Sequence, residues 1–149
     1  MKLAVSNIAW PAALRDEAYA LLRNHGVTGL EIAPGLFLAD AKDPFEPTLA
    51  EADAALDFMH KAGLTLVSMQ SLLFGVSGAN LFGGETARDT LVHAVERAIE
   101  LARRLEIPNL VFGSPRQRAY LDSLTSAEAE AQAVDVFRRL GDRAMAANT

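Results

Sequence analysis

The sequence contains no cysteine among its 149 residues. Disulfide bonds and thiolate metal sites are therefore excluded, and we expect a cytoplasmic protein. No segment reaches the roughly 18 consecutive apolar residues that a membrane-spanning helix requires. The N-terminal stretch has too short an apolar run before Arg15 and Asp16 to serve as a secretory signal. The sequence thus predicts no membrane partner.

A basic surface is also lacking, because 14 Lys and Arg residues face 19 Asp and Glu residues, for a formal net charge of -5. Proteins that bind nucleic acids normally carry a basic patch or stripe, so we expect no DNA or RNA partner. Half of the residues are hydrophobic, and 149 residues are enough to enclose one hydrophobic core. We therefore expect a single domain over residues 1–149.

Four short apolar runs recur along the chain. They are KLAVSN at 2–7, GLEIAP at 29–34, TLVSMQ at 65–70 and NLVFGS at 109–114. Short apolar runs bounded by Gly, Pro or polar residues are typical of strands covered on both faces, as in parallel sheets. A helical pattern follows each run, so the sequence predicts strands that alternate with helices.

Helix boundary signals support this alternation. Pro11 suits a first helical position, and Pro108 ends the helix predicted from Thr86 to Glu106. Two pairs, Thr48 with Glu51 and Thr125 with Glu128, have capping-box spacing at the start of the second and fourth helices. For the last helix, the spacing predicts a buried side made of Val134, Phe137 and Leu140.

Strand followed by helix four times implies right-handed crossovers and a parallel sheet. Dividing 149 residues by four gives about 37 per unit, so eight units would make about 300 residues, within the range of a TIM barrel. An isolated four-stranded sheet would leave both outer strands unpaired. We therefore predict an α/β fold, (βα)4, the first half of a TIM (βα)8 barrel. A missing C-terminal half or a second copy would then cover its edge strands.

The order of KLAVSNIAW, GLEIAP, SMQSLLFG and LVFGSPRQR resembles the N-terminal half of the sugar phosphate isomerase/epimerase group. That group belongs to the xylose-isomerase-like TIM barrels, which also include AP endonuclease family 2. The resemblance covers essentially the whole chain, and SMQSLLFG and GSPRQR are its more specific parts. It implies a metal-dependent isomerase or epimerase that acts on a small sugar or sugar phosphate.

The resemblance also implies a divalent metal (Mn, Mg, Co or Zn) held by Glu, Asp, His and Glu side chains. Most of these ligands project from strands five to eight, which this chain lacks. We therefore expect the chain alone to supply no catalytic residue and to bind no metal. It would instead supply the rim that orients the substrate.

Ligands bind at the C-terminal ends of the strands in α/β barrels. Six residues near these ends are our candidate substrate-binding residues: Trp10, Glu31, Gln70, Ser114, Arg116 and Arg118. An isolated carboxylate such as Glu31 is costly on a buried strand unless it is paired or hydrogen-bonded. Glu31 could contact a sugar hydroxyl or support another site residue, or it could form a structural salt bridge with a nearby arginine.

Arg116 and Arg118 follow the fourth predicted strand. A guanidinium offers a planar fork of donors, so two of them could clamp one phosphate or carboxylate. Alternatively, both could lie on a solvated loop and pair with Asp122. Ser114 would add a hydroxyl or a backbone N–H at the same rim.

Gln70 stands where some members of the superfamily place a metal-binding histidine. An amide is a poorer zinc ligand than an imidazole, so we interpret Gln70 as a hydrogen-bonding residue, which argues against a three-metal, endonuclease-type site. Trp10 could stack on the apolar face of a sugar, or it could cap the first helix. We expect none of His25, His60 and His93 to be a metal ligand, because they lie on helices away from the strand ends.

The loop at 74–84 contains four glycines but matches no phosphate-binding motif. We predict a flexible lid in which Leu81 and Phe82 are exposed or fold over bound substrate.

Two other hypotheses stay open at this point. The chain could be a catalytically incomplete fragment or a self-associating half-barrel without enzyme activity of its own. A flavodoxin-like open sheet is a weaker alternative, because neither a phosphate loop nor an acidic cluster follows the first predicted strand.

Overall fold

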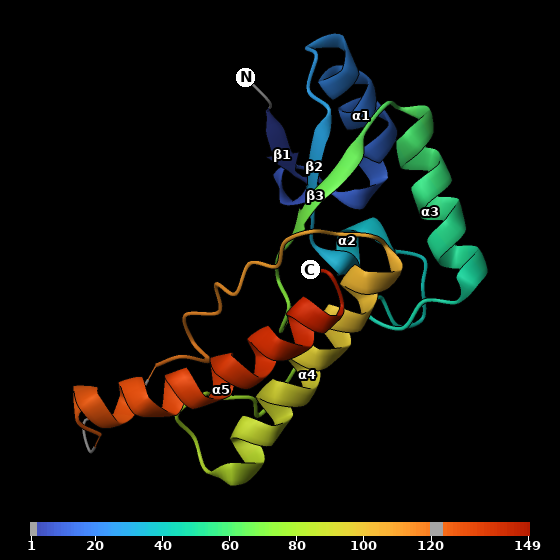
Figure 1. Cartoon of the computed structure of the whole chain (residues 1–149). Coiled ribbons are helices and arrows are strands. Elements are labelled where there is room, and N and C mark those ends of the chain that lie inside the picture. The colour runs from blue at the N-terminus through green and yellow to red at the C-terminus, as the bar shows by residue number, and fades with distance from the viewer. Residues whose placement is uncertain (1–2, 120–123) are drawn as a thin grey trace.

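The computed structural model describes residues 3–119 and 124–149 (Figure 1). Its strands are β1 (Ala4–Ser6), β2 (Gly29–Ile32) and β3 (Thr65–Met69). Its α-helices are α1 (Arg15–Asn24), α2 (Pro34–Phe37), α3 (Leu49–Lys61), α4 (Glu85–Arg104) and α5 (Ser126–Ala146), and two short 3-10 helices, η1 (Asn7–Ala9) and η2 (Ala12–Leu14), follow β1.

The three strands form one parallel sheet in consecutive order, β1-β2-β3. Ser6 pairs with Glu31, and Glu31 pairs with Ser68 after a register shift between Leu30 and Glu31. Consecutive order is what a barrel requires, whereas a flavodoxin-like sheet places its first strand between the second and the third. The flavodoxin-like alternative is therefore wrong for the strands that the structure describes.

The fourth predicted strand is reduced to one parallel bridge between Leu110 and Met69. The Met69 N–H donates to Asn109 O at 2.9 Å, and the Val111 N–H donates to Met69 O at 2.8 Å. The prediction of a strand over 109–114 was wrong beyond this bridge. The segment runs beside β3 in the expected order, but it has no described neighbour on its other side, and Ser114 leaves the extended region at φ 31°.

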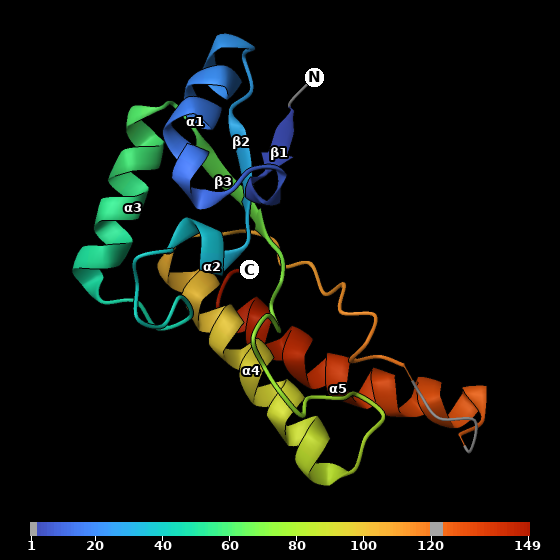
Figure 2. The ribbon, with the colours of Figure 1, turned by 180° about the vertical axis from the view of Figure 1, so that it is seen from behind.

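The first core cluster joins the sheet to the helices on one of its faces. Leu30, Ile32 and Met69 have no exposed surface and pack with Tyr19, Met59 and Leu101 from α1, α3 and α4. In both ribbon views α1 and α3 lie on the same side of the sheet (Figures 1 and 2). The opposite face of β1–β3 is therefore the one on which a ligand could lie.

A second core cluster holds α4 and α5 together through Leu91, Val95, Val136 and Leu140. Leu81 belongs to this cluster and is almost fully buried, so of the two alternatives predicted for it, exposure to solvent is wrong. Phe82 is half-buried against the same cluster, and the Leu81 N–H donates to Gln117 O at 2.7 Å. The second half of the predicted lid is thus anchored in the core.

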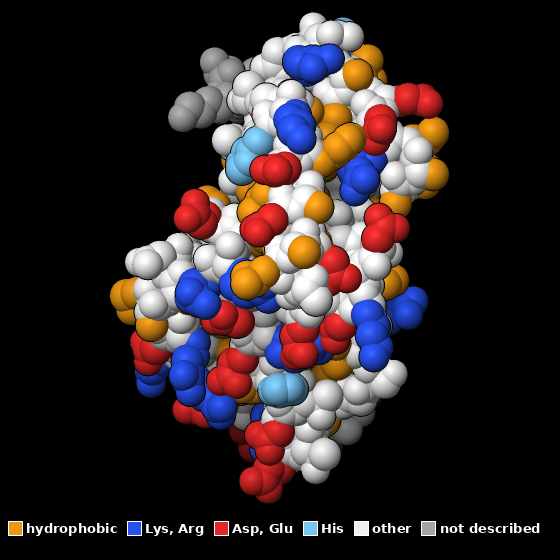
Figure 3. Space-filling model, turned by 90° about the vertical axis from the view of Figure 1, so that its right-hand side faces the viewer, with side chains coloured by type: hydrophobic (Ala, Val, Ile, Leu, Met, Phe, Trp, Pro, Cys, Tyr) orange, Lys and Arg blue, Asp and Glu red, His pale blue; other side chains and the backbone are white. Residues whose placement is uncertain are grey.

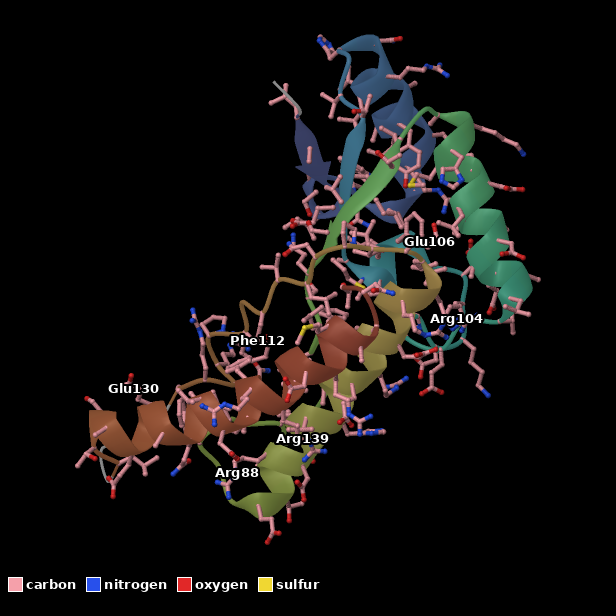
Figure 4. The ribbon with its side chains drawn as sticks, viewed as in Figure 1. Arg88, Arg104, Glu106, Phe112, Glu130 and Arg139 are labelled. Atoms are coloured by element: carbon pink, nitrogen blue, oxygen red, sulfur yellow. The ribbon has the colours of Figure 1, made fainter. Side chains whose placement is uncertain are left out.

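The predicted buried side of α5 is correct at Leu140 only. Val134 is 46% exposed and Phe137 is 37% exposed, while Val136 takes the buried position instead. The rings of Phe137 and Phe112 meet edge to face with centroids 5.0 Å apart. Phe112 belongs to the segment after α4 and lies next to α5 (Figure 4).

Both predicted capping boxes are confirmed. The Glu51 N–H donates to Thr48 Oγ1 at 3.3 Å while the Thr48 N–H donates to Glu51 Oε2 at 2.7 Å, and Thr125 and Glu128 repeat the arrangement. The backbone N–H of Thr48, followed by its hydroxyl, lowers the pKa of Glu51. For Glu128 the hydroxyl of Thr125 comes first and its backbone N–H second, again lowering the pKa.

Polar contacts tie the outer elements together. Arg97 on α4 pairs with Asp43 at 2.6 Å and Glu46 at 2.7 Å, in the segment before α3. Arg104 donates to Pro47 O at 2.8 Å, and Arg139 on α5 pairs with Glu96 on α4 at 3.3 Å (Figure 4). Acidic and basic side chains are mixed across the helical side of the molecule (Figure 3).

No helix within the described residues is long and apolar enough to cross a membrane.

Candidate functional site

A row of polar side chains runs across the face of the sheet that α1 and α3 leave open. Successive residues of a strand point to opposite faces, and Leu30 and Ile32 of β2 face the helices. Glu31 between them therefore faces the other way, together with Ser6 and Ser68, with which it is in register. All three lie at or near the C-terminal ends of their strands.

Gln70 connects these side chains into one hydrogen-bonded network. Its Nε2 donates to Ser6 Oγ at 2.7 Å and to Glu31 Oε1 at 2.6 Å. The Ser68 hydroxyl donates to Glu31 Oε2 at 2.6 Å. Each carboxylate oxygen of Glu31 thus accepts one hydrogen bond, and the Gln70 Oε1 is left as an acceptor at the sheet surface.

The network satisfies the requirement that a half-buried carboxylate be hydrogen-bonded. No arginine pairs with Glu31 among the described residues, whose salt bridges involve other carboxylates. The salt-bridge alternative for Glu31 is therefore not found in this part of the chain.

Asn7 links the turns that follow β1 and β2. It is one of two buried polar residues among those described. The Ala33 N–H donates to Asn7 Oδ1 at 2.7 Å, and Asn7 Nδ2 donates to Ala33 O at 3.3 Å. This two-way contact joins the turn after β1 to the turn after β2, so it holds Ser6 and Glu31 in register.

A cavity of about 420 Å³ opens beyond Gln70, between the turn after β3 and the turn after the fourth segment. Its polar lining consists of Ser71, Ser77, Ser114 and Gln117. Ser71 has φ 59° and Ser114 has φ 31°, conformations that are uncommon for residues other than glycine and that recur at functional sites. The predicted rim residue Ser114 thus borders a cavity.

Arg116 and Arg118 are both exposed. Neither forms a salt bridge with a described residue, and their alternative partner Asp122 lies outside the described residues. Gln117 between them lines the cavity, whereas the two arginines do not. The anion clamp therefore stays a prediction.

Trp10 packs against the first core cluster, and its ring meets Tyr19 edge to face at 6.3 Å. Burial raises the pKa of Tyr19 to about 12. This position matches the helix-capping alternative for Trp10, which lines none of the described cavities.

Sequence reasoning missed several residues of the site: Ser6, Asn7, Ser68, Phe74 and Gln117. Ser6 and Ser68 occupy the same face as Glu31, but which strand positions pair across the sheet is not visible in the sequence. The register shift next to Glu31 hides this relation in the sequence.

The described residues do not fit a divalent metal. No group of three or more His, Asp or Glu side chains gathers in this part of the chain. Both oxygens of Glu31 are engaged with Ser68 and Gln70. The site can bind and orient hydroxyl groups with the donors and acceptors of its own side chains.

Comparisons with known proteins agree with this architecture. The family model of the xylose isomerase-like TIM barrel matches residues 19–149. No curated protein sequence matches the chain.

Solved structures with the same fold are sugar epimerases and isomerases. A D-psicose 3-epimerase from Clostridium cellulolyticum H10, solved with D-tagatose, superposes with a TM-score of 0.70 at 16% identity, over 100% of this chain and 50% of that one. A D-psicose 3-epimerase with D-fructose gives 0.68 at 17% identity, over 99% and 50%. A sugar phosphate isomerase/epimerase from Parabacteroides distasonis gives 0.66 at 15% identity, over 99% and 48%. The chain spans about half the length of the structures that it matches.

Proposed function

The chain belongs to the xylose isomerase-like TIM barrel family, and from this premise we propose that it forms the N-terminal, substrate-orienting half of a sugar isomerase or epimerase. Residues 1–149 would act as one domain, the first four units of the barrel. Strands five to eight would come from a C-terminal half or from a second copy. The hydrogen-bonded network of Ser6, Glu31, Ser68 and Gln70 is the observation that supports this proposal.

In this proposal the network supplies binding and orientation. Gln70 is already held by two donated hydrogen bonds. Its Oε1 can therefore accept a hydrogen bond from a sugar hydroxyl without the entropy cost of ordering a free side chain on binding. Glu31 keeps Gln70 and Ser68 in place, and the Ser6 hydroxyl can donate to a second sugar oxygen. A network whose members are already satisfied is pre-organised for a polyhydroxylated ligand.

Metal dependence of the complete enzyme is part of the proposal, and the metal would be held by residues outside this chain. Arg116 and Arg118 would meet a phosphate group if the substrate carries one. A cytoplasmic location and the lack of a nucleic-acid partner remain predictions from composition.

Binding of simple ketohexoses tests the proposal. We expect D-tagatose, D-psicose or D-fructose to bind the chain weakly in isothermal titration. The Gln70→Leu variant should bind about tenfold more weakly, since a hydrogen bond of about 1.4 kcal/mol is lost. Leu49→Ala, an exposed residue of α3, is the matched control. Equal binding by the Gln70 and control variants would contradict the assignment.

A second candidate function is a self-associating half-barrel without activity of its own. The observation that favours it is exposed apolar surface on both flanks of the sheet, with Leu3 and Ile8 at the β1 edge and Val111, Val134 and Phe137 at the other. Native mass spectrometry should then give a dimer, and the chain should show no epimerase turnover. Turnover by the purified monomer would contradict this alternative.

A further inference from the structure

Phe74 is a large aromatic residue that the fold holds in solvent. It ends a turn in which its N–H donates to Ser71 O at 3.0 Å. The two residues before it, Leu72 and Leu73, are buried in the first and second core clusters respectively, whereas Phe74 is 77% exposed. The two residues before Phe74 therefore anchor the turn, while the ring itself is displayed at the strand ends.

The ring forms one wall of an apolar cavity of about 190 Å³. The cavity is lined by Ile8, Ala33, Gly35, Leu36, Ser71 and Phe74, which come from the segments that follow β1, β2 and β3. A Cβ atom placed on Gly35 would lie 3.9 Å from Phe74 Cδ1, so one edge of the ring lies close to the start of α2. No charged side chain lines this cavity.

The larger cavity described above has a mixed lining, in which Leu73, Phe74 and Val76 accompany the polar residues. Ser71 and Phe74 line both cavities, and the remaining polar lining of the larger one comes from Ser77, Ser114 and Gln117. Phe74 therefore stands between a cavity of mixed lining and an apolar cavity. Both adjoin the hydrogen-bonded network, because Ser71 follows Gln70 directly and Ala33 is held by Asn7.

We propose that Phe74 is a specificity-determining residue that divides the strand-end face into two subsites, and that the apolar subsite receives a ligand end with neither charge nor hydroxyl. The identity of that ligand as a sugar rests on the proposed function. A phosphate in the apolar subsite would lose its hydration and meet no cation, with the Ser71 hydroxyl as the one side-chain donor in the lining, which is costly. A methyl group would gain from burial, so the subsite fits the methyl end of a deoxy sugar.

A matched pair of ligands measures the preference. D-tagatose and 6-deoxy-D-tagatose differ only in a terminal hydroxymethyl and methyl group. We expect the deoxy sugar to bind the chain at least about fivefold more tightly, because a methyl is buried and no hydroxyl is left unpaired. Phe74→Ala should reduce this ratio to near one, and Gly35→Val, which fills the cavity, should reduce it as well. Leu49→Ala should leave the ratio unchanged.

A second measurement does not depend on sugar binding. Xenon occupies small apolar cavities, so it should shift the methyl signals of Ile8 and Leu36 in the intact chain and fail to do so in Gly35→Val. Leu49 methyls, exposed on α3, report non-specific effects. Circular dichroism of each variant establishes that it is folded.

The outcomes separate this proposal from the proposed function. Xenon shifts without binding of any sugar would support the apolar subsite and contradict the sugar-binding function. Sugar binding with no deoxy preference, or with a preference that survives Phe74→Ala, would overturn the subsite and leave the function standing. Methyl shifts of Ile8 and Leu36 on simple dilution would identify the cavity as a contact between copies and would also overturn the subsite.

Discussion

The segments at 29–34 and 109–114 carry similar apolar runs but behave differently. The first contains β2, which has a parallel neighbour on each side and pairs along its whole length. The second has β3 on one side and forms a single bridge at Leu110. Leu30 in β2 has no exposed surface, whereas Val111 is 40% exposed. The difference teaches that an apolar run alone does not decide how far a strand extends, because the neighbours that cover its backbone and side chains also decide it.

The largest expected difference between the two segments is the loss of stability when one side chain in each is truncated. Leu30→Ala removes a fully buried side chain and should lower the free energy of unfolding by about 3 kcal/mol, through lost burial and the cavity left behind. Val111→Ala should cost less than about 1 kcal/mol. Urea denaturation followed by circular dichroism measures both, and equal losses would contradict the comparison.

The second-largest difference in stability is expected for polar residues of the two segments. Glu31→Ala leaves Ser68 without its acceptor and Gln70 with Ser6 as its one acceptor, and it should cost about 2 kcal/mol of unfolding free energy. Ser114→Ala at the end of the other segment should change it by less than about 0.5 kcal/mol. The same denaturation experiment checks the pair, and a Glu31→Ala variant as stable as the parent would show that the network adds nothing to stability.

The contact between Phe112 and Phe137 is what fixes the second segment to α5. Phe137→Leu keeps an apolar side chain but loses the edge-to-face contact, so it should destabilise the chain by about 1 kcal/mol. Amide exchange should rise around Phe112 and stay unchanged in β2. A uniform rise across both segments would mean that the flank and the central sheet unfold as one unit.

The smallest effect concerns pH and the helices that follow the two regions. The pKa values of Glu51 and Glu128 lie below their ordinary value of 4.5, so their stabilising contribution is complete above that value and is lost as the pH falls through the lowered pKa. Unfolding free energy should therefore decline below about pH 4.5. Thr48→Ala and Thr125→Ala should each flatten that decline, and an unchanged slope would contradict the role of the capping boxes.

The sequence was enough to predict the order of elements and their family. Alternation of apolar runs with capped helices indicates a parallel sheet, and strand-end position singled out Glu31 and Gln70, which do lie in one network. The extent of the fourth strand could not be predicted, because it depends on a neighbour that the run itself does not encode. The partners Ser6 and Ser68 depend on register, which shifts next to Glu31.

The burial of several individual side chains could not be predicted from the sequence either. Helical spacing assigns Val134 and Phe137 to a buried face, but spacing cannot tell which side of α5 meets α4. Leu81 looked like part of a mobile loop because glycines surround it, and its burial depends on α4 and α5 packing around it. In each case a tertiary contact, and not local propensity, decided the outcome.

The most direct test of the central claim, that the polar face of β1–β3 binds a sugar, is to follow the side-chain N–H signals of Gln70 by nuclear magnetic resonance as D-tagatose is added. The account predicts that the two Nε2–H signals shift saturably, together with the backbone amides of Ser71 and Gln117. Shifts confined to the helical side of the molecule, with the Gln70 signals unmoved at saturation, would contradict it.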